Sequence, residues 1–161
     1  MKDLCDNIGP DSQCRVACLP AGTLLLRDQY RIEQPLINGG FGITYLARDS
    51  LNRQVVVKEC YPEEICQRTQ NGVCARSDDM KGGFAQIKRQ FKREAHRLAN
   101  LQHPNIVGVH QVFEENGTVY LVMDFVEGLD LQKLIETEPE RLAPERHRQV
   151  AGNFPSGYAF V

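Results

Sequence analysis

A glycine-rich turn at residues 39–42 constrains this chain more than any other part of its sequence. Three of its four residues are glycine, and the remaining one is Phe41. Glycine lets a backbone approach a phosphate closely, and a lysine at a strand end supplies the matching positive charge. Lys58 ends an all-valine run sixteen residues after Gly42. The turn and the lysine together indicate phosphate binding, which the glycines alone would not.

The segments around this turn predict an antiparallel sheet. Residues 30–33 alternate, residues 43–47 return after the turn, and Val55–Lys58 is β-branched and continuous enough to be a central strand. Pro35 indicates a sheet edge, where the missing N–H of proline is tolerated. Two more strands, 106–113 and 118–123, are joined through Asn116-Gly117, the strongest short-range hairpin signal.

Composition limits the classes of protein to which the chain can belong. Its 161 residues are 42% hydrophobic and 25% charged, which predicts one globular domain. A net charge of -2 gives no reason to expect nucleic acid or an anionic membrane as a partner. No apolar stretch approaches the roughly 20 residues of a membrane span, and the acidic N-terminus is unlike a signal peptide. The six cysteines form no Cys-x-x-Cys pair, so we expect a cytoplasmic protein with reduced thiols and no metal site.

One carboxylate interrupts the apolar stripe of the helix predicted over residues 83–101. Its apolar positions leave a gap between Phe91 and Leu98, and Glu94 occupies that gap. A carboxylate facing the sheet would need a cation, and Lys58 is the natural candidate. The alternative is a slightly rotated helix with Glu94 solvated at its boundary. The pattern alone leaves both interpretations open.

Four motifs in this order resemble the N-terminal lobe of bacterial, eukaryotic-like serine/threonine protein kinases. They are Gly39–Tyr45, Val55–Lys58, Glu94 and Leu101–Val107. The resemblance implies an α+β fold with a five-stranded antiparallel sheet and one main helix. It places the kinase N-lobe at residues 28–126, after a poorly ordered lead-in over 1–27. Residues 127–161 would be the hinge and an incomplete, helical start of a C-lobe, with a helix beginning at 145–152.

The resemblance also implies how the chain would hold the phosphates of ATP. Gly39 and Gly42 match the second and third glycines of the loop that covers them, with Gly40 and the aromatic Phe41 at the tip of that loop. Lys58 matches the lysine that contacts the α- and β-phosphates. Glu94 matches the helix glutamate that holds this lysine, which makes the Lys58–Glu94 pair the expected catalytic pair.

The adenine and ribose would be bound by the strand that leads into the hinge. Val56 replaces the small alanine that usually lies over the adenine, and Met123 matches the gatekeeper. The backbones of Asp124 and Val126 would meet the adenine edge, and Asp130 matches the acid that takes a ribose hydroxyl.

Two kinase segments do not occur in the sequence. Neither His-Arg-Asp nor Asp-Phe-Gly is present, although phosphoryl transfer needs the catalytic aspartate and the magnesium ligands of these segments. We therefore expect an ATP-binding lobe truncated before the catalytic loop and catalytically incomplete, with Mg²⁺ bound only if a complete C-lobe is supplied. Two alternatives stay open. One is a non-catalytic, pseudokinase-like module that binds a complementary kinase lobe or another protein, and the other is a decayed gene fragment.

Overall fold

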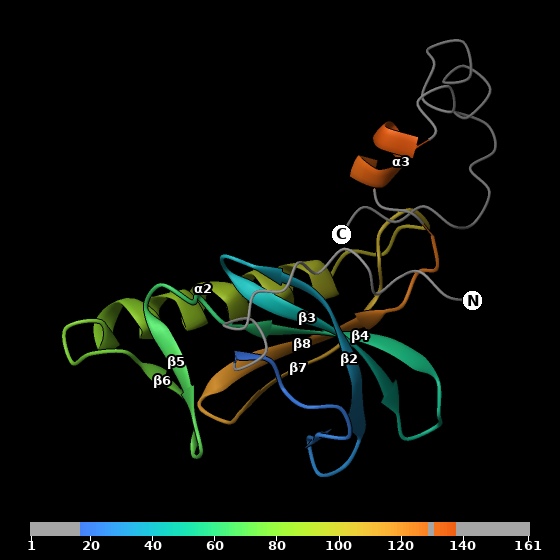
Figure 1. The fold of residues 1–161 in the computed structure, drawn as a ribbon. Helices are drawn as coiled ribbons and strands as arrows, with labels where there is room; N and C mark the ends of the chain where they lie inside the picture. The colour runs from blue at the N-terminus through green and yellow to red at the C-terminus, as the bar shows by residue number, and fades with distance from the viewer. Residues whose placement is uncertain (1–16, 129–130, 138–161) are drawn as a thin grey trace.

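The computed structural model describes residues 17–128 and 131–137 of the chain. Its main feature is an antiparallel six-stranded sheet in the order β1-β2-β3-β4-β8-β7 (Figure 1). The strands of this sheet are β1 (Leu24–Leu25), β2 (Tyr30–Gly39), β3 (Gly42–Asp49), β4 (Gln54–Cys60), β7 (Val109–Glu115) and β8 (Thr118–Asp124). The other elements are the hairpin β5 (Cys66–Thr69) and β6 (Gly72–Ala75) and the helices α2 (Lys81–Ala99) and α3 (Leu131–Thr137). The predicted α+β fold is confirmed, with β1 as a sixth strand.

Two local predictions about the sheet are also confirmed. Asn116 and Gly117 have φ angles of 47° and 76°, and they close the β7–β8 hairpin as a type I′ turn requires. Pro35 lies where β2 pairs with β3 alone, since the described residues of β1 reach only Tyr30 and Arg31. A missing N–H is tolerated at such an edge, because no second strand of the described residues pairs with β2 there.

The segment between β4 and α2 contains a regular hairpin, although Pro62 and Gly72 in its sequence are typical of turns. Strands β5 and β6 form a hairpin that lies beside the N-terminal half of α2 (Figure 1). Its tip rests on the β7–β8 turn, where the Val73 N–H donates to the Asn116 carbonyl at 2.7 Å. Gly72 has a φ of +113°, and a side chain there would overlap the Asn116 backbone. This hairpin is thus anchored to the main sheet.

The two faces of the sheet are packed by different parts of the chain. On one face the core includes Tyr45, Val57, Tyr120 and Val122, together with residues from the hairpin and from the segment before β1. On the other face Val56, Leu121 and Met123 pack against Ala95 of α2. Strand alternation explains the division, because successive side chains of β4 point to opposite faces.

Part of the predicted lead-in belongs to this core. The sequence predicted a poorly ordered segment up to residue 27, whereas Ala17, Leu19 and Leu25 are buried and β1 pairs with β2. These three residues follow no strand or helix period in the sequence, so only tertiary contacts reveal their role. The helix expected at residues 145–152 lies outside the described residues. No helix within the described ranges is both long and apolar enough to cross a bilayer.

Candidate nucleotide-binding site

Strand register brings the predicted phosphate-binding residues to neighbouring strands. Gly42 begins β3 opposite Cys60 of β4, and Thr44 lies opposite Lys58. On the other side of β4, Val56 lies opposite Met123 of β8. The glycine turn, Lys58, Val56 and Met123 are therefore arranged across three adjacent strands.

The glycine turn is open at its tip and tightly packed at its end. Gly39 and Gly40 are exposed, and the Phe41 ring is 79% exposed. A side chain at Gly40 would meet no atom within 4 Å, whereas one at Gly42 would overlap the Glu59 carbonyl of β4. Gly42 is thus required by the close approach of two strands, a reason that is independent of any phosphate.

Lys58 is the one charged side chain of β4 on the α2 face of the sheet. It follows Val56 by two positions, so both side chains point to the face where Met123 and Ala95 are buried. Lys58 is half-buried. It takes part in none of the ion pairs of the described residues, which leaves its ammonium able to receive an anionic ligand.

Of the two interpretations that the pattern leaves open for Glu94, the structure shows the second, in which its carboxylate is solvated. Glu94 is exposed, and its neighbour Ala95 is 1% exposed and fills the gap between Phe91 and Leu98. Both positions fit a helical stripe, and burial favours the apolar alanine over the carboxylate. Accordingly, no ion pair joins Lys58 to Glu94 in the part of the chain that the structure describes.

The end of β8 is fixed by the side chain of Asp124. Its carboxylate accepts from the Gly108 N–H at 3.0 Å and lies 2.6 Å from His110 Nε2. Its backbone N–H donates to the Gly108 carbonyl at 2.9 Å. Met123 is buried just before it, and Val126, two residues after it, is half-buried. Asp130 lies outside the described residues.

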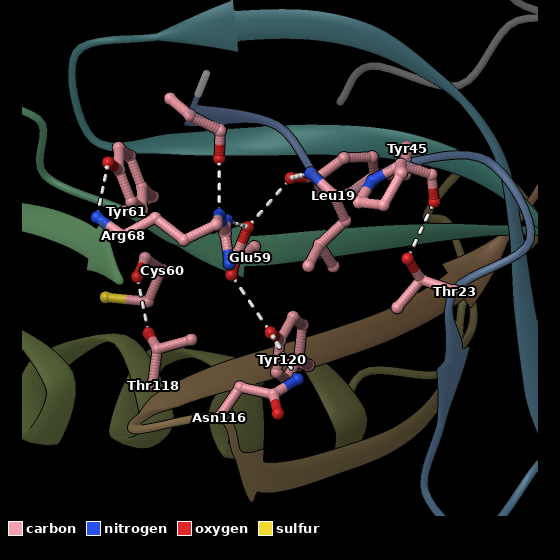
Figure 2. A network of polar contacts seen from close by, with 12 residues as sticks. Leu19, Thr23, Tyr45, Glu59, Cys60, Tyr61, Arg68, Asn116, Thr118 and Tyr120 are labelled. Atoms are coloured by element: carbon pink, nitrogen blue, oxygen red, sulfur yellow. Dashed lines mark hydrogen bonds and ion pairs between the residues drawn. The ribbon is translucent and has the colours of Figure 1, made fainter. Parts of the chain in front are cut away.

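A buried ion pair that was not predicted from the sequence lies on the opposite face of β4 from Lys58. Glu59 is fully buried, and its carboxylate accepts from Arg68 Nη2 at 2.6 Å, from the Tyr45 hydroxyl at 2.8 Å and from the Tyr120 hydroxyl at 2.9 Å (Figure 2). Arg68 comes from hairpin strand β5, and its Nε donates to the Ala17 carbonyl at 2.6 Å. One carboxylate therefore connects β3, β4 and β8 to the hairpin.

The protonation states of this cluster suit its hydrogen bonds. Burial and the Glu59 charge raise the pKa of both the Tyr45 and Tyr120 hydroxyls, so both stay protonated and donate. Burial alone would lower the pKa of Arg68, but its hydrogen bond and attraction to Glu59 raise it overall. The buried carboxylate is thus matched by one cation and two neutral donors.

The sequence carried a signal for this pair. Val55, Val57 and Glu59 alternate on one face of a strand whose valines predict a central position. A carboxylate in that series points into the core, and it requires a buried cation. The partner could not be located from spacing, because Arg68 is brought back by the turn of residues 61–65 rather than by a strand or helix period.

Comparisons with known proteins agree on one family. The sequence profile described as protein kinase domain matches residues 30–160. The chain is 32% identical over 108 residues to the serine/threonine-protein kinase PrkC of Bacillus subtilis, and 30% identical over 144 residues to the kinase pkn2 of Myxococcus xanthus. These alignments cover 66% and 89% of this chain. The fold is similar to a solved structure described as "PpkA-294 apo form", with a TM-score of 0.77 and 30% identity over 83% of this chain.

The similar proteins are much longer than this chain. It spans 14% of PrkC, 15% of pkn2 and 47% of the solved PpkA chain. The comparisons therefore bear on the fold and family of these residues rather than on the activity of a whole enzyme.

Proposed function

Because the chain belongs to the protein kinase domain family, we propose that its sheet and helix α2 form the ATP-binding lobe of a serine/threonine protein kinase. The observation that carries this proposal is the register of β3, β4 and β8. It brings the glycine turn and Lys58 to adjacent strands, with Val56 and Met123 on the same face as the lysine.

The phosphates would lie between the glycine turn and Lys58. Gly39, Gly40 and Phe41 form an exposed lid, and a half-buried ammonium without an ion-pair partner among the described residues suits a triphosphate. Because Ile37 stands at the first glycine position of the family loop, the lid would approach the nucleotide less closely there.

The adenine would lie against the apolar part of the same face. Val56 and Met123 are buried there, and the backbones of Asp124 and Val126 would meet the edge of the base. The bonds from Asp124 to Gly108 and His110 would hold this strand end in place. Asp130 is the proposed partner of a ribose hydroxyl.

Glu94 would pair with Lys58 only after helix α2 turns. Glu94 lies one residue from the buried Ala95, which corresponds to a rotation of about 100° around the helix axis. The proposed pair therefore belongs to a second position of α2, which ligand binding would have to stabilise.

Phosphoryl transfer would need residues that this sequence does not contain. Magnesium and the attacking hydroxyl are held in the family by the Asp-Phe-Gly and His-Arg-Asp segments, which are absent from the 161 residues. The described residues bring together no group of three or more metal-ligating side chains, so we assign no Mg²⁺ ligand. The function proposed for this chain is nucleotide binding.

Replacing Lys58 with methionine tests this proposal. A hydrogen bond to a charged group contributes about 1.5–3 kcal/mol, so Lys58→Met is expected to weaken ATP binding roughly tenfold to a hundredfold. Lys81→Met is the matched control, because Lys81 is an exposed lysine at the start of α2. Isothermal titration calorimetry on the 161-residue chain would measure both. Equal ATP affinity of the unaltered chain and Lys58→Met would refute the assignment.

A further inference from the structure

We propose that the β5–β6 hairpin is a clamp that holds Lys58 in its phosphate-binding position, acting through the buried Glu59–Arg68 ion pair. This inference rests on the proposed function, because it gives the hairpin a role at the same nucleotide site. Glu59 and Arg68 are positioning residues, since neither touches the nucleotide.

The first step is the geometry of β4. Lys58 and Glu59 are consecutive, so their side chains leave the strand on opposite faces. The Glu59 carboxylate is fixed by three donors from three different elements, namely Tyr45 of β3, Tyr120 of β8 and Arg68 of β5. Fixing the backbone at residue 59 fixes the direction in which the side chain of residue 58 leaves the strand.

The second step is the connection to the glycine turn. Gly42 packs so closely on β4 that an added Cβ would overlap the Glu59 carbonyl. The backbone of residue 59 therefore contacts the end of the glycine turn while its side chain is held by the hairpin. A displacement of Glu59 would move the lid and Lys58 together.

The third step is the way in which Arg68 is held. Its side chain is only 13% exposed, its Nε donates to Ala17, and its guanidinium lies 5.2 Å from the centre of the Tyr61 ring. The Tyr61 hydroxyl accepts from the Arg68 backbone N–H at 3.2 Å. Arg68 is thus fixed at both its backbone and its guanidinium, as a clamp requires.

The hairpin is itself held at its tip. Val73 bonds to the β7–β8 turn, and Gly72 and Gly117 let the two backbones approach closely. Lys88 of α2 donates to the Gly117 carbonyl at 2.9 Å. The hairpin therefore makes two separate connections. Through Arg68 it contacts Glu59, on the strand that carries Lys58. Through Val73 it contacts the β7–β8 turn, to which Lys88 of α2 also donates.

The test compares Arg68→Met with Arg76→Met. Arg76 directly follows the hairpin and is exposed, and its side chain donates to the Glu63 carbonyl, so this control removes the same charge without touching Glu59. We expect Arg68→Met to weaken ATP binding about fivefold to tenfold, a part of the loss caused by Lys58→Met. Arg76→Met should bind ATP as the unaltered chain does.

A second ligand distinguishes positioning from general loosening. Adenosine lacks the phosphates that Lys58 would contact, so a clamp on Lys58 predicts that its affinity is unchanged in Arg68→Met. The loss of ATP affinity should also disappear when Arg68→Met is made in the Lys58→Met background. Equal weakening of ATP and adenosine, or additive losses in the double variant, would overturn the clamp.

Hydrogen exchange separates this proposal from the one on which it rests. Amides of residues 42–49 and 54–60 should exchange faster in Arg68→Met than in Arg76→Met. If the unaltered chain binds no ATP, the proposed function fails, and the clamp on Lys58 fails with it. If ATP binds but exchange at these residues is unchanged, only the clamp is refuted. Should Arg68→Met not fold, as judged by circular dichroism, Glu59→Gln replaces it, since glutamine keeps an acceptor for the tyrosines.

Discussion

Replacing Gly42 with alanine tests whether strand packing or phosphate binding explains the last glycine of the turn. An added Cβ at Gly42 would overlap the Glu59 carbonyl, which belongs to a strand that is paired with β3 on one side and with β8 on the other. Since that backbone cannot move without disturbing the buried Glu59 carboxylate, the overlap is relieved only at a cost in stability. Gly40→Ala is the matched control, because a Cβ at Gly40 meets nothing within 4 Å.

The expected loss follows from the cost of inserting a methyl group into a packed core. Such overpacking costs typically about 1–3 kcal/mol, and the rigid position of Glu59 favours the middle of that range. We therefore expect Gly42→Ala to lower the free energy of unfolding by about 2 kcal/mol and the midpoint temperature by about 4–8 °C. Gly40→Ala should be unchanged or slightly more stable, because alanine reduces the entropy of the unfolded chain.

Urea unfolding without nucleotide measures both variants. The chain has no tryptophan, so circular dichroism of the sheet and helix is a better signal than fluorescence. Leaving out nucleotide is essential, because it removes any contribution of Gly42 to phosphate binding. Identical unfolding midpoints for Gly42→Ala and Gly40→Ala would refute the packing argument and leave nucleotide approach as the reason for this glycine.

Two further predictions concern ionisable side chains. Burial raises the pKa of the Cys60 thiol to about 11 and that of Cys66 to about 12, whereas Cys74 is exposed. Iodoacetamide at neutral pH should therefore modify Cys74 well before Cys60 or Cys66, and peptide mass mapping would show this order. Equal rates of modification of the three thiols in the folded chain would contradict the packing of β4 and β5. The hydrogen bond and charge of Lys92 lower the pKa of Glu114 in the folded chain. The charged carboxylate therefore stabilises the fold at any pH above the pKa that Glu114 has in the unfolded chain. This stability is lost as the pH falls through the lower pKa of the folded chain. Because the pair is exposed, Glu114→Gln should lower the free energy of unfolding by about 0.5 kcal/mol near neutral pH and leave it unchanged in strong acid. Urea titrations over a series of pH values would measure this. A difference in stability that persisted in acid would exclude the ion pair as its cause.

Much of the fold follows from local sequence patterns. The Asn116-Gly117 hairpin, the central position of Val55–Lys58 and the edge at Pro35 all appear where they were predicted. In each case the signal is local, since a turn conformation, a β-branched run or a missing N–H is a property of a few consecutive residues. The predicted helix 83–101 likewise differs from Lys81–Ala99 only at its ends, where such patterns are weakest.

The apolar pattern of the sequence could not predict how that helix is rotated about its axis. The residues at positions 94 and 95 both fit between Phe91 and Leu98, and the sequence does not say which of the two the sheet will bury. Packing buries Ala95 rather than Glu94, because a small apolar side chain can be buried without a partner and a carboxylate cannot. The location of Glu94 relative to Lys58 is therefore a property of the packed state of α2.

By itself the sequence determined the family, the sheet and the positions of the glycine turn and Lys58, because these depend on short motifs and on alternation along single strands. Only the tertiary structure decided that Gly42 is pressed against β4 and that Arg68 pairs with Glu59 behind Lys58. The hairpin that carries Arg68 returns through a turn with no fixed period, and a buried charge selects its partner by proximity in space. Spacing along the chain could show that Glu59 needs a cation, but it could not show which one.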